Sequence, residues 1–367
     1  MRVLVSGANG FIGKNLTVHL NEQNIDYLTF NRENSVSNLY NLISESDFIV
    51  HLAGENRPED EEDFNLVNAN LTASICEVAE SMGKKIPIIF ASSTQASLSN
   101  AYGKSKLEAE IILKKFEKNT GSPIYIYRLP GVFGKWCKPN YNSVVATFCH
   151  NISHNLPIQI DNPDHELTLV YIDDVIKEFI GIIKKRKINK KVFSINPEYK
   201  IKLGKLATQI EHFRDSRSTL ISENVGKGFV RKLYSTYVSY LSTIHFAYPL
   251  PAYNDERGLF AEILKTKESG QFSFFTAKPG VVRGGHYHHT KTEKFLVVHG
   301  EAKFGFRNII SGKTFDILVT SDKLEIIETI PGWSHNITNV GDTKMVVMLW
   351  ANEIFDPNNP DTIKSKV

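Results

Sequence analysis

The sequence lacks several features that would place it in a special class. Its three cysteines, Cys76, Cys137 and Cys149, form neither a disulfide framework nor a C-x-x-C metal clip, so we expect a reducing cytoplasm. No apolar run approaches the roughly 18–20 residues of a membrane helix, and Gly7 and Gly10 interrupt the apolar start too early for a signal peptide. The net charge of +3 comes without a long Lys/Arg run, which argues against nucleic acid as a partner.

What is present is the composition of an ordinary globular protein, with 41% hydrophobic and 11% aromatic residues to build cores. At roughly 150 residues per domain, 367 residues suggest two or three domains. One residue type is unevenly distributed, because five of the 12 histidines fall between His286 and His335. Composition alone does not explain this cluster.

The two halves of the chain have different patterns. In the first half, strand-like segments at residues 2–5, 27–30, 48–52, 86–90 and 125–128 alternate with helix-like segments such as 11–20, 70–82 and 104–118. This alternation predicts a Rossmann-type, doubly wound parallel sheet. From residue 246 onward helical periodicity largely disappears, and short strand-like runs separated by turn signals predict a jelly-roll β-barrel, with strands at 271–276, 294–298, 302–306, 314–319, 324–328 and 344–349. The expected fold is therefore α/β plus all-β, with domains at 1–245 and 246–367.

A glycine-rich segment from Gly7 to Gly13 follows the first expected strand and opens the first expected helix. Glycines in that context permit a tight turn and let the backbone approach a pyrophosphate at a helix N-terminus. At the end of the second strand, NAD-binding proteins place an acidic residue on the ribose 2′-hydroxyl. Here Arg32 stands at that point, which favours the 2′-phosphate of NADP(H). The alternatives are a plain tight turn and a solvated surface arginine.

Tyr102 and Lys106 form a Y-x-x-x-K pair that shares one face of an expected helix. The ammonium group can lower the phenol pKa from its usual value of about 10 and hold the nicotinamide ribose. The preceding strand ends in a Ser-Ser-Thr segment, so Ser93 or Thr94 can bind the substrate oxygen beside the tyrosine. The pair alone also occurs by chance in many helices.

Together these motifs resemble the extended short-chain dehydrogenase/reductase family, over roughly residues 1–240. The resemblance implies NAD(P)-linked chemistry on nucleotide sugars, with Tyr102 as general acid, Lys106 as its modulator and Thr94 or Ser93 as polar partner. The cofactor-binding residues that it implies are Gly7, Gly10, Phe11, Ile12, Gly13, Arg32, Leu52, Ala53, Gly54, Asn68, Tyr102, Lys106 and Arg128.

The histidine cluster contains a G(x)5HxH(x)4E(x)6G pattern that includes His286, His288 and Glu293, and His335 follows in a later P-G-W-S-H segment. Residues two apart on a strand point to the same face, so both histidines of the H-x-H pair enter a barrel together. Glu293 and His335 on other strands complete an N₃O set suited to a divalent metal such as Zn²⁺. The pattern resembles the cupin signature. The alternative is a metal-free cupin whose polar residues only bind sugar.

Three further residues are candidates for substrate binding. Residues 255–258 look like a segment of cupin-type deoxysugar epimerases, in which Arg257 would contact nucleotide phosphates, although a surface turn is an equally fair interpretation. Asn142 and Ser143 end a K-W-C-K-P-N-Y-N-S segment. With that segment, the whole chain resembles the CapF-type bifunctional enzymes of capsule and O-antigen synthesis.

That resemblance implies a UDP-linked 4-keto-6-deoxy-N-acetylhexosamine as substrate. The cupin domain would invert C3, and NADPH would then reduce the C4 ketone to give UDP-2-acetamido-2,6-dideoxy-L-talose, on the route to UDP-N-acetyl-L-fucosamine. It also implies a cytoplasmic homodimer joined through the cupin domain, with no nucleic-acid or membrane partner. One alternative is a plain NADPH-dependent 4-ketoreductase with a non-catalytic cupin used for dimerisation, and another is an NADP-sensing scaffold protein.

Overall fold

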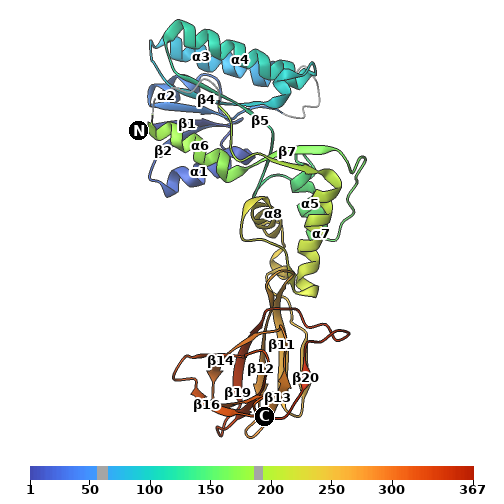
Figure 1. Cartoon of the computed structure of the whole chain (residues 1–367). Coiled ribbons are helices and arrows are strands. Elements are labelled where there is room, and N and C mark those ends of the chain that lie inside the picture. The colour runs from blue at the N-terminus through green and yellow to red at the C-terminus, as the bar shows by residue number, and fades with distance from the viewer. Residues whose placement is uncertain (56–64, 186–192) are drawn as a thin grey trace. The chain divides into compact units, whose positions relative to one another are not determined.

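The computed structural model of the protein describes residues 1–55, 65–185 and 193–367, and the chain divides into two compact units (Figure 1). The first unit consists of Met1–Ile210 and Arg231–Leu241, and the second of Glu211–Val230 and Ser242–Val367. The chain therefore passes from one unit to the other more than once between residues 210 and 242. The single domain boundary near residue 246 stays a prediction.

The first unit is built around a five-stranded parallel sheet with strand order β2-β1-β3-β4-β5. The strands are β1 (Arg2–Ser6), β2 (Asp26–Phe30), β3 (Phe48–His51), β4 (Ile88–Ser93) and β5 (Ile124–Leu129). The helices beside it are α1 (Phe11–Glu22), α2 (Asn38–Ser44), α3 (Leu71–Ser81), α4 (Ala101–Thr120) and α6 (Ile172–Lys185). Figure 1 shows α2, α3 and α4 on one face of the sheet and α1 and α6 on the other, so the sheet is doubly wound.

Buried apolar side chains explain why these strands form. β3 is buried along its whole length, as expected for a parallel strand that is covered by helices on both faces. Its Ile49 packs with Leu4 of β1 and Phe90 of β4 in one core cluster, to which Leu113 of α4 also belongs. This core fixes the carboxyl ends of the strands, where the loops that carry the sequence motifs begin.

The rest of the described chain before the strands of the second unit is a small sheet with order β6-β7-β8 and three helices, two of which continue across the division between the units at residues 210–211 and 230–231. The elements are β6 (Gly131–Phe133), α5 (Val144–Ser153), β7 (Glu166–Tyr171), β8 (Tyr199–Lys202), α7 (Leu203–Thr219) and α8 (Gly228–Val238). A π-helical turn, Asn65–Asn70, leads into α3, and a 3₁₀ turn, Thr94–Ser97, follows β4. Every helix in the described ranges is too short or too polar to serve as a membrane span.

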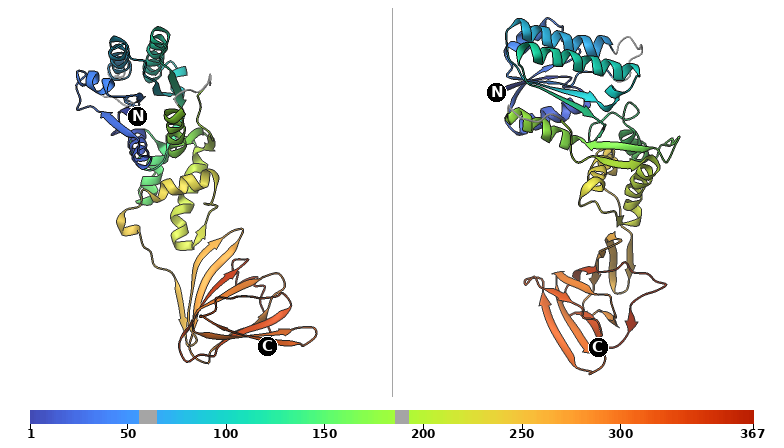
Figure 2. Two further views of the ribbon diagram at one scale, coloured as in Figure 1. Left: turned by 90° about the vertical axis from the view of Figure 1, so that its left-hand side faces the viewer. Right: turned by 45° about the horizontal axis from the view of Figure 1, so that its top comes forward.

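The second unit consists of two packed sheets, visible in Figure 2. One has the order β10-β11-β12-β19-β14-β17, with β9 beside β11, and the other has the order β16-β15-β18-β13-β20. The strands are β9 (Ile221–Ser222), β10 (Ala252–Asp255), β11 (Gly258–Thr266), β12 (Gly270–Ala277), β13 (Val282–Tyr287), β14 (Glu293–His299), β15 (Glu301–Asn308), β16 (Thr314–Thr320), β17 (Ile326–Glu328), β18 (Trp333–Asn339), β19 (Met345–Ala351) and β20 (Ile363–Lys364).

The two sheets are held together by aromatic side chains that meet between them. Phe295 of one sheet lies 5.7 Å, ring centroid to ring centroid, from Phe304 of the other, and Phe275 packs against Phe295 at 6.5 Å. Such contacts add to the burial of apolar area that stabilises a two-sheet core. The predicted fold, a Rossmann-type sheet followed by an all-β barrel, is confirmed.

Candidate functional sites

The glycine-rich segment after β1 forms a loop packed tightly against the end of β3. Gly7 has a φ of +71°, and a Cβ atom there would lie 2.7 Å from the backbone nitrogen of Ala53. A Cβ atom at Gly13, in the first turn of α1, would lie 2.3 Å from the carbonyl oxygen of Gly7. A side chain at either position would collide with backbone, so this loop requires glycine in order to lie close to the helix N-terminus.

The loop also lies where a ligand is expected in this topology. β1 pairs with β2 on one side and β3 on the other, so the strand order reverses at its carboxyl end. Among the described residues no side chain caps the N-terminus of α1, and its first turn holds no acidic residue. The N–H groups there suit a phosphate. The structure thus brings together the predicted cofactor-binding residues Gly7, Gly10, Phe11, Ile12, Gly13, Leu52, Ala53 and Gly54.

Arg32 lies just beyond β2, as predicted, and its side chain is largely exposed. Its guanidinium forms an ion pair with the carboxylate of Glu55, which also accepts a hydrogen bond of 2.8 Å from the Tyr141 hydroxyl. The contact between Arg32 and a 2′-phosphate stays a prediction.

Asn68 and Arg128 hold neighbouring parts of this site together. The amide group of Asn68 accepts a hydrogen bond from the backbone N–H of Glu55 and donates one to the Ser105 hydroxyl, both at 3.0 Å. Arg128 makes a two-pronged ion pair with Glu110 of α4, at 2.9 and 2.8 Å. These contacts join the segment after β3 and the end of β5 to α4. Direct contact of either residue with a cofactor stays a prediction.

Tyr102 lies in the first turn of α4, which Asn100 caps through a 2.7 Å hydrogen bond from the Gly103 N–H. Its hydroxyl is hydrogen-bonded to the side chain of Ser93 at the end of β4, whereas Thr94 begins the following turn and is exposed. The structure therefore pairs Tyr102 with Ser93. Burial raises the pKa of Tyr102, with a smaller lowering by the Ser93 hydrogen bond, so the lowered pKa expected from sequence is not observed. The phenol keeps its proton at neutral pH.

Lys106 lies one turn further along α4 and is buried. Its ammonium donates a 3.2 Å hydrogen bond to the carbonyl of Ala91 and lies 5.9 Å from the centroid of the Tyr102 ring. A Cβ atom at Gly54 would lie 3.0 Å from this ammonium, so Lys106 reaches the segment that follows β3. Burial lowers the pKa of Lys106 to about 8. The side chain thus lies beside both the tyrosine and the segment that follows β3.

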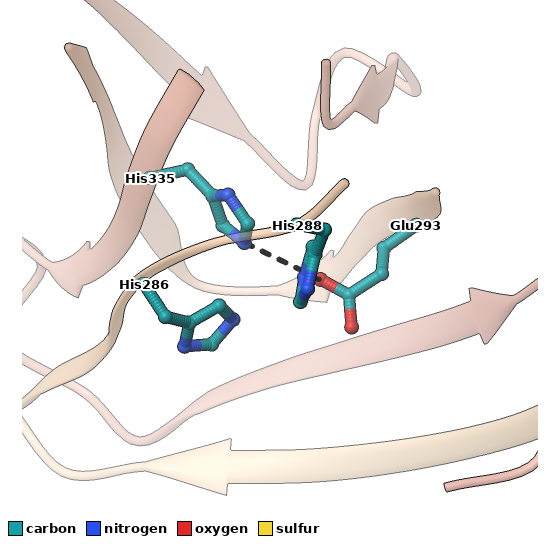
Figure 3. Close-up of side chains that lie close together, drawn as sticks. All are labelled: His286, His288, Glu293 and His335. Carbon is teal, nitrogen blue, oxygen red and sulfur yellow. Dashed lines mark hydrogen bonds and ion pairs between the residues drawn. The ribbon is translucent and has the colours of Figure 1, made fainter. Parts of the chain in front are cut away.

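The histidine cluster converges in the second unit (Figure 3). His286 lies in β13, His288 just beyond its end, Glu293 at the start of β14 and His335 in β18. One potential ligand atom from each lies within 4.8 Å of those of the other three. The predicted N₃O set is therefore assembled from both sheets.

The hydrogen bonds of this cluster decide which ring nitrogens face its centre. His288 Nδ1 donates to the backbone carbonyl of Asp361, and His335 Nδ1 faces the carbonyl of Trp333 at 3.4 Å. Their Nε2 atoms consequently lie 3.2 and 3.3 Å from the same oxygen, Glu293 Oε2. His335 Nε2 is buried and has no hydrogen bond within the described structure. Electron-pair donors that converge in this way fit a bound cation.

The charge states of the cluster suit metal ligation as well. Burial and the neighbouring His335 lower the pKa of His286 to about 4, so its ring is neutral at physiological pH. Burial alone would raise the pKa of Glu293, but its neighbours, among them the ammonium of Lys291 at 3.2 Å, lower it well below its usual range. Neutral imidazoles and one carboxylate are the forms that a divalent metal requires.

Two functional candidates beside this cluster escaped the sequence analysis. Arg283 lines the same pocket as His286 and Glu293, and its buried Nε and Nη2 atoms have no hydrogen-bond partner among the described residues. Lys291 is buried with its ammonium 3.2 Å from Glu293 Oε1. Arg283 is partly buried, and the ion pair of its Nη2 with Asp255 is as long as 4.0 Å, so donors without a hydrogen bond are costly here unless a ligand satisfies them. The sequence signal that could have identified Arg283 was its position three residues before the H-x-H pair.

Two of the three remaining predicted substrate contacts, Arg257 and Ser143, have protein partners. Arg257 lies in the exposed turn between β10 and β11, where it pairs with Asp255 at 2.5 Å. Ser143 caps α5 by accepting a 3.3 Å hydrogen bond from the Ala146 N–H, and Asn142 beside it is exposed. Their roles in substrate binding stay predictions.

Comparison with known proteins places the chain in a family. The NAD dependent epimerase/dehydratase family matches residues 3–196, and the polysaccharide biosynthesis C-terminal domain matches residues 253–363. The chain is 54% identical to the UDP-2-acetamido-2,6-beta-L-arabino-hexul-4-ose reductase of Pseudomonas aeruginosa, over all of this chain and 99% of that protein. The crystal structure of the capsular polysaccharide assembling protein CapF from Staphylococcus aureus is 42% identical, covers both chains completely and superimposes with a TM-score of 0.91.

More distant structures cover only part of the chain and share its fold alone. The UDP-glucose 4-epimerase of Thermotoga maritima is 17% identical, covers 65% of this chain and 98% of its own, and has a TM-score of 0.56. Because the reductase and CapF match the whole chain, the likeness includes both units in their order along the sequence. The chain belongs to the NAD dependent epimerase/dehydratase family and, within it, to the CapF-type proteins with a second, all-β domain.

Proposed function

We propose that this protein converts a UDP-linked 4-keto-6-deoxy-N-acetylhexosamine in two steps, C3 epimerisation in the all-β unit and C4 reduction in the Rossmann-type unit. The product would be UDP-2-acetamido-2,6-dideoxy-L-talose, on the route to UDP-N-acetyl-L-fucosamine for capsule or O-antigen. The observation that carries the proposal is the convergence of His286, His288, Glu293 and His335, since a barrel used only for dimerisation needs no such set. The name of the Pseudomonas relative, a 4-ulose reductase, supports the second step.

The chemistry fixes the order of the two steps. The proton on C3 is acidic because it lies next to the C4 ketone, and removing it leaves a charge that the ketone oxygen shares. Once C4 has been reduced to an alcohol, this acidity is lost. Epimerisation must therefore precede reduction.

The epimerase site would use the pocket that His286, Glu293 and His335 line together with Arg283. A divalent metal held by these four residues, with Zn²⁺ as our assignment, would supply positive charge for the ketone oxygen during proton removal. The free guanidinium donors of Arg283 provide hydrogen bonds for an oxygen of the substrate in the same pocket. Lys291 holds Glu293 as a carboxylate.

The reductase site would use Tyr102, Ser93 and Lys106. NADPH bound at the glycine loop would supply the hydride for C4. Tyr102, which is protonated at neutral pH, donates a proton to the C4 oxygen, and Ser93, whose side chain is hydrogen-bonded to Tyr102, would donate a hydrogen bond to the same oxygen and orient it. Lys106 lies beside Gly54, one of the predicted cofactor-binding residues, where its ammonium would hold the ribose.

The pairing of Tyr102 with Ser93 leads to a test of which hydroxyl acts. Ser93→Ala should lower kcat for NADPH oxidation about a hundredfold, because one oriented hydrogen-bond donor to a developing oxyanion is lost. Thr94→Val, which changes the exposed neighbour, should leave kcat within about threefold of the wild type. Steady-state kinetics with the 4-keto sugar measure both. Equal losses in the two variants would show that the assignment of Ser93 is wrong.

The pKa of Lys106 predicts a pH dependence of the reduction. Its charged form is the active one, so kcat/KM should be constant below pH 8 and fall as the pH rises through about 8, where the ammonium loses its proton. A pH–rate profile of NADPH oxidation measures this limb. Lys106→Arg keeps its charge over that range and should abolish the limb, even if the rate is lower. A limb at the same pH in Lys106→Arg would assign it to another group.

The metal and the first step can be tested without NADPH. The purified protein should contain about one Zn²⁺ per chain, and in D₂O it should exchange the C3 proton of the keto sugar for deuterium. Metal-containing protein that produces no exchange would favour the plain reductase with a non-catalytic second unit. The preference for NADP(H), a homodimer through the second unit and a cytoplasmic location complete the proposal.

A further inference from the structure

One stretch of the second unit contacts three of the four proposed metal ligands or their immediate neighbours. Residues 361–366, here called the anchor segment, follow β19 in the sequence and include β20. β20 pairs with β13 at His286 and Tyr287. The carbonyl oxygen of Ser365 accepts a 2.8 Å hydrogen bond from Ser334, the residue next to His335.

The strongest of these contacts are made by Asp361. Its backbone carbonyl accepts the hydrogen bond from His288 Nδ1, which fixes the tautomer and turns Nε2 toward Glu293. Its carboxylate accepts three backbone N–H groups in a row, from His289 at 2.9 Å, Thr290 at 2.6 Å and Lys291 at 2.8 Å. The hydroxyl of Thr290 adds a fourth hydrogen bond at 3.0 Å.

These bonds tie Asp361 to the loop that leads from His288 to Glu293. The carboxylate holds the loop backbone, and because the loop is held, the carbonyl of the same residue meets the ring of His288. The loop also carries Lys291, whose ammonium lies 3.2 Å from the other oxygen of Glu293. A residue 73 positions away from His288 therefore orients one ligand and places the cation that faces another.

We infer that Asp361 is a positioning residue of the proposed metal site and that the anchor segment sets its affinity for the metal. The inference rests on the proposed function, because it presupposes that the four-residue cluster binds a metal. Groups that orient a ligating histidine typically contribute 10–100-fold to metal affinity. Asp361 would act through His288 and would touch neither metal nor substrate.

Asp361→Asn is the informative variant because it keeps the shape of the side chain but not its acceptors. In the wild type both oxygens of the Asp361 carboxylate accept hydrogen bonds, so the amide of the variant must present its NH₂ group to at least one backbone N–H of the loop. Asp356→Asn is the matched control. Asp356 lies five residues earlier and likewise accepts a backbone N–H, that of Asn358 at 2.9 Å, but it makes no contact with the ligand loop among the described contacts.

The experiment measures Zn²⁺ affinity of the full-length protein by competition with a chromogenic chelator. We expect Asp361→Asn to bind Zn²⁺ about 10–100-fold more weakly than the wild type, with Asp356→Asn unchanged. The visible absorption spectrum of the Co²⁺-substituted Asp361→Asn variant should also differ from that of the wild type. A loss of stability at a distance from the site would not produce this difference. Thermal unfolding of the metal-free proteins in EDTA separates the two effects.

Each outcome has one meaning. If the wild type binds Zn²⁺ and Asp361→Asn binds it equally tightly, the inference is wrong and the metal site stands, even where the melting temperature of the metal-free variant is lower. If the wild type binds no Zn²⁺, the proposed metal site itself fails. If Asp361→Asn does not fold, Ser334→Ala carries the test, because it removes another contact of the anchor segment and should also weaken Zn²⁺ binding.

Discussion

Tyr102→Phe should lower NADPH oxidation by the 4-keto sugar about a hundred- to ten-thousand-fold, the usual contribution of a general acid. The substitution removes only the hydroxyl that is hydrogen-bonded to Ser93, so the partly buried ring should keep its place in α4. Deuterium exchange at C3 in D₂O should continue at the wild-type rate, because the proposed epimerase residues lie in the other unit.

The control for this variant is Tyr40→Phe, which removes the hydroxyl of an exposed tyrosine of the same unit. It should change neither reaction. The exchange is followed by NMR and the reduction by the absorbance of NADPH. Loss of exchange together with reduction in Tyr102→Phe would mean that the two sites are not independent.

His288→Ala should produce the opposite pattern. Removing this buried ligand leaves only three of the four proposed ligands, His286, Glu293 and His335, so the metal content should fall from about one per chain to near zero. Exchange at C3 should fall more than about a hundredfold, a larger loss than outer groups of metal sites cause. Reduction of a sugar that has already been epimerised should persist, because Tyr102, Ser93 and Lys106 are untouched.

His289→Ala provides the matched control for the metal site. The ring of His289 is exposed and packs against Tyr287, so its loss should spare both metal and exchange. Metal content is measured by atomic emission on protein purified without added Zn²⁺. Full exchange by a demetallated protein would rule out the metal's role in epimerisation.

Much of the fold followed from local patterns. The glycine segment and the H-x-H-(x)4-E spacing each involve residues that are close in the sequence, on one strand, the loop after it and the next element. The expected strands of the first half are likewise short stretches of sequence. The structure brings each of these groups together. β10 and β11 were not among the expected strands. The sequence of β11, G-L-F-A-E-I-L-K-T, contains helix formers, and its extended form depends on pairing with β12.

The features that the sequence did not predict depend on strand register, on where a strand ends, or on contacts between residues far apart in the sequence. A register shift between Gly284 and His286 in β13 breaks the alternation of faces, so Arg283 and His286 line the same pocket although they are three residues apart. The choice between Ser93 and Thr94 depends on where β4 ends and the 3₁₀ turn begins. Asp361 meets His288 through pairing between distant strands, for which the local sequence holds no signal.

The most direct test of the two-step proposal is one reaction run to completion in D₂O with the UDP-linked 4-keto sugar and NADPH. We predict a single product, UDP-2-acetamido-2,6-dideoxy-L-talose, that carries deuterium at C3 and forms with one NADPH oxidised per molecule. A reduced product that keeps its original C3 configuration and its C3 proton would contradict the proposal and leave a plain 4-ketoreductase.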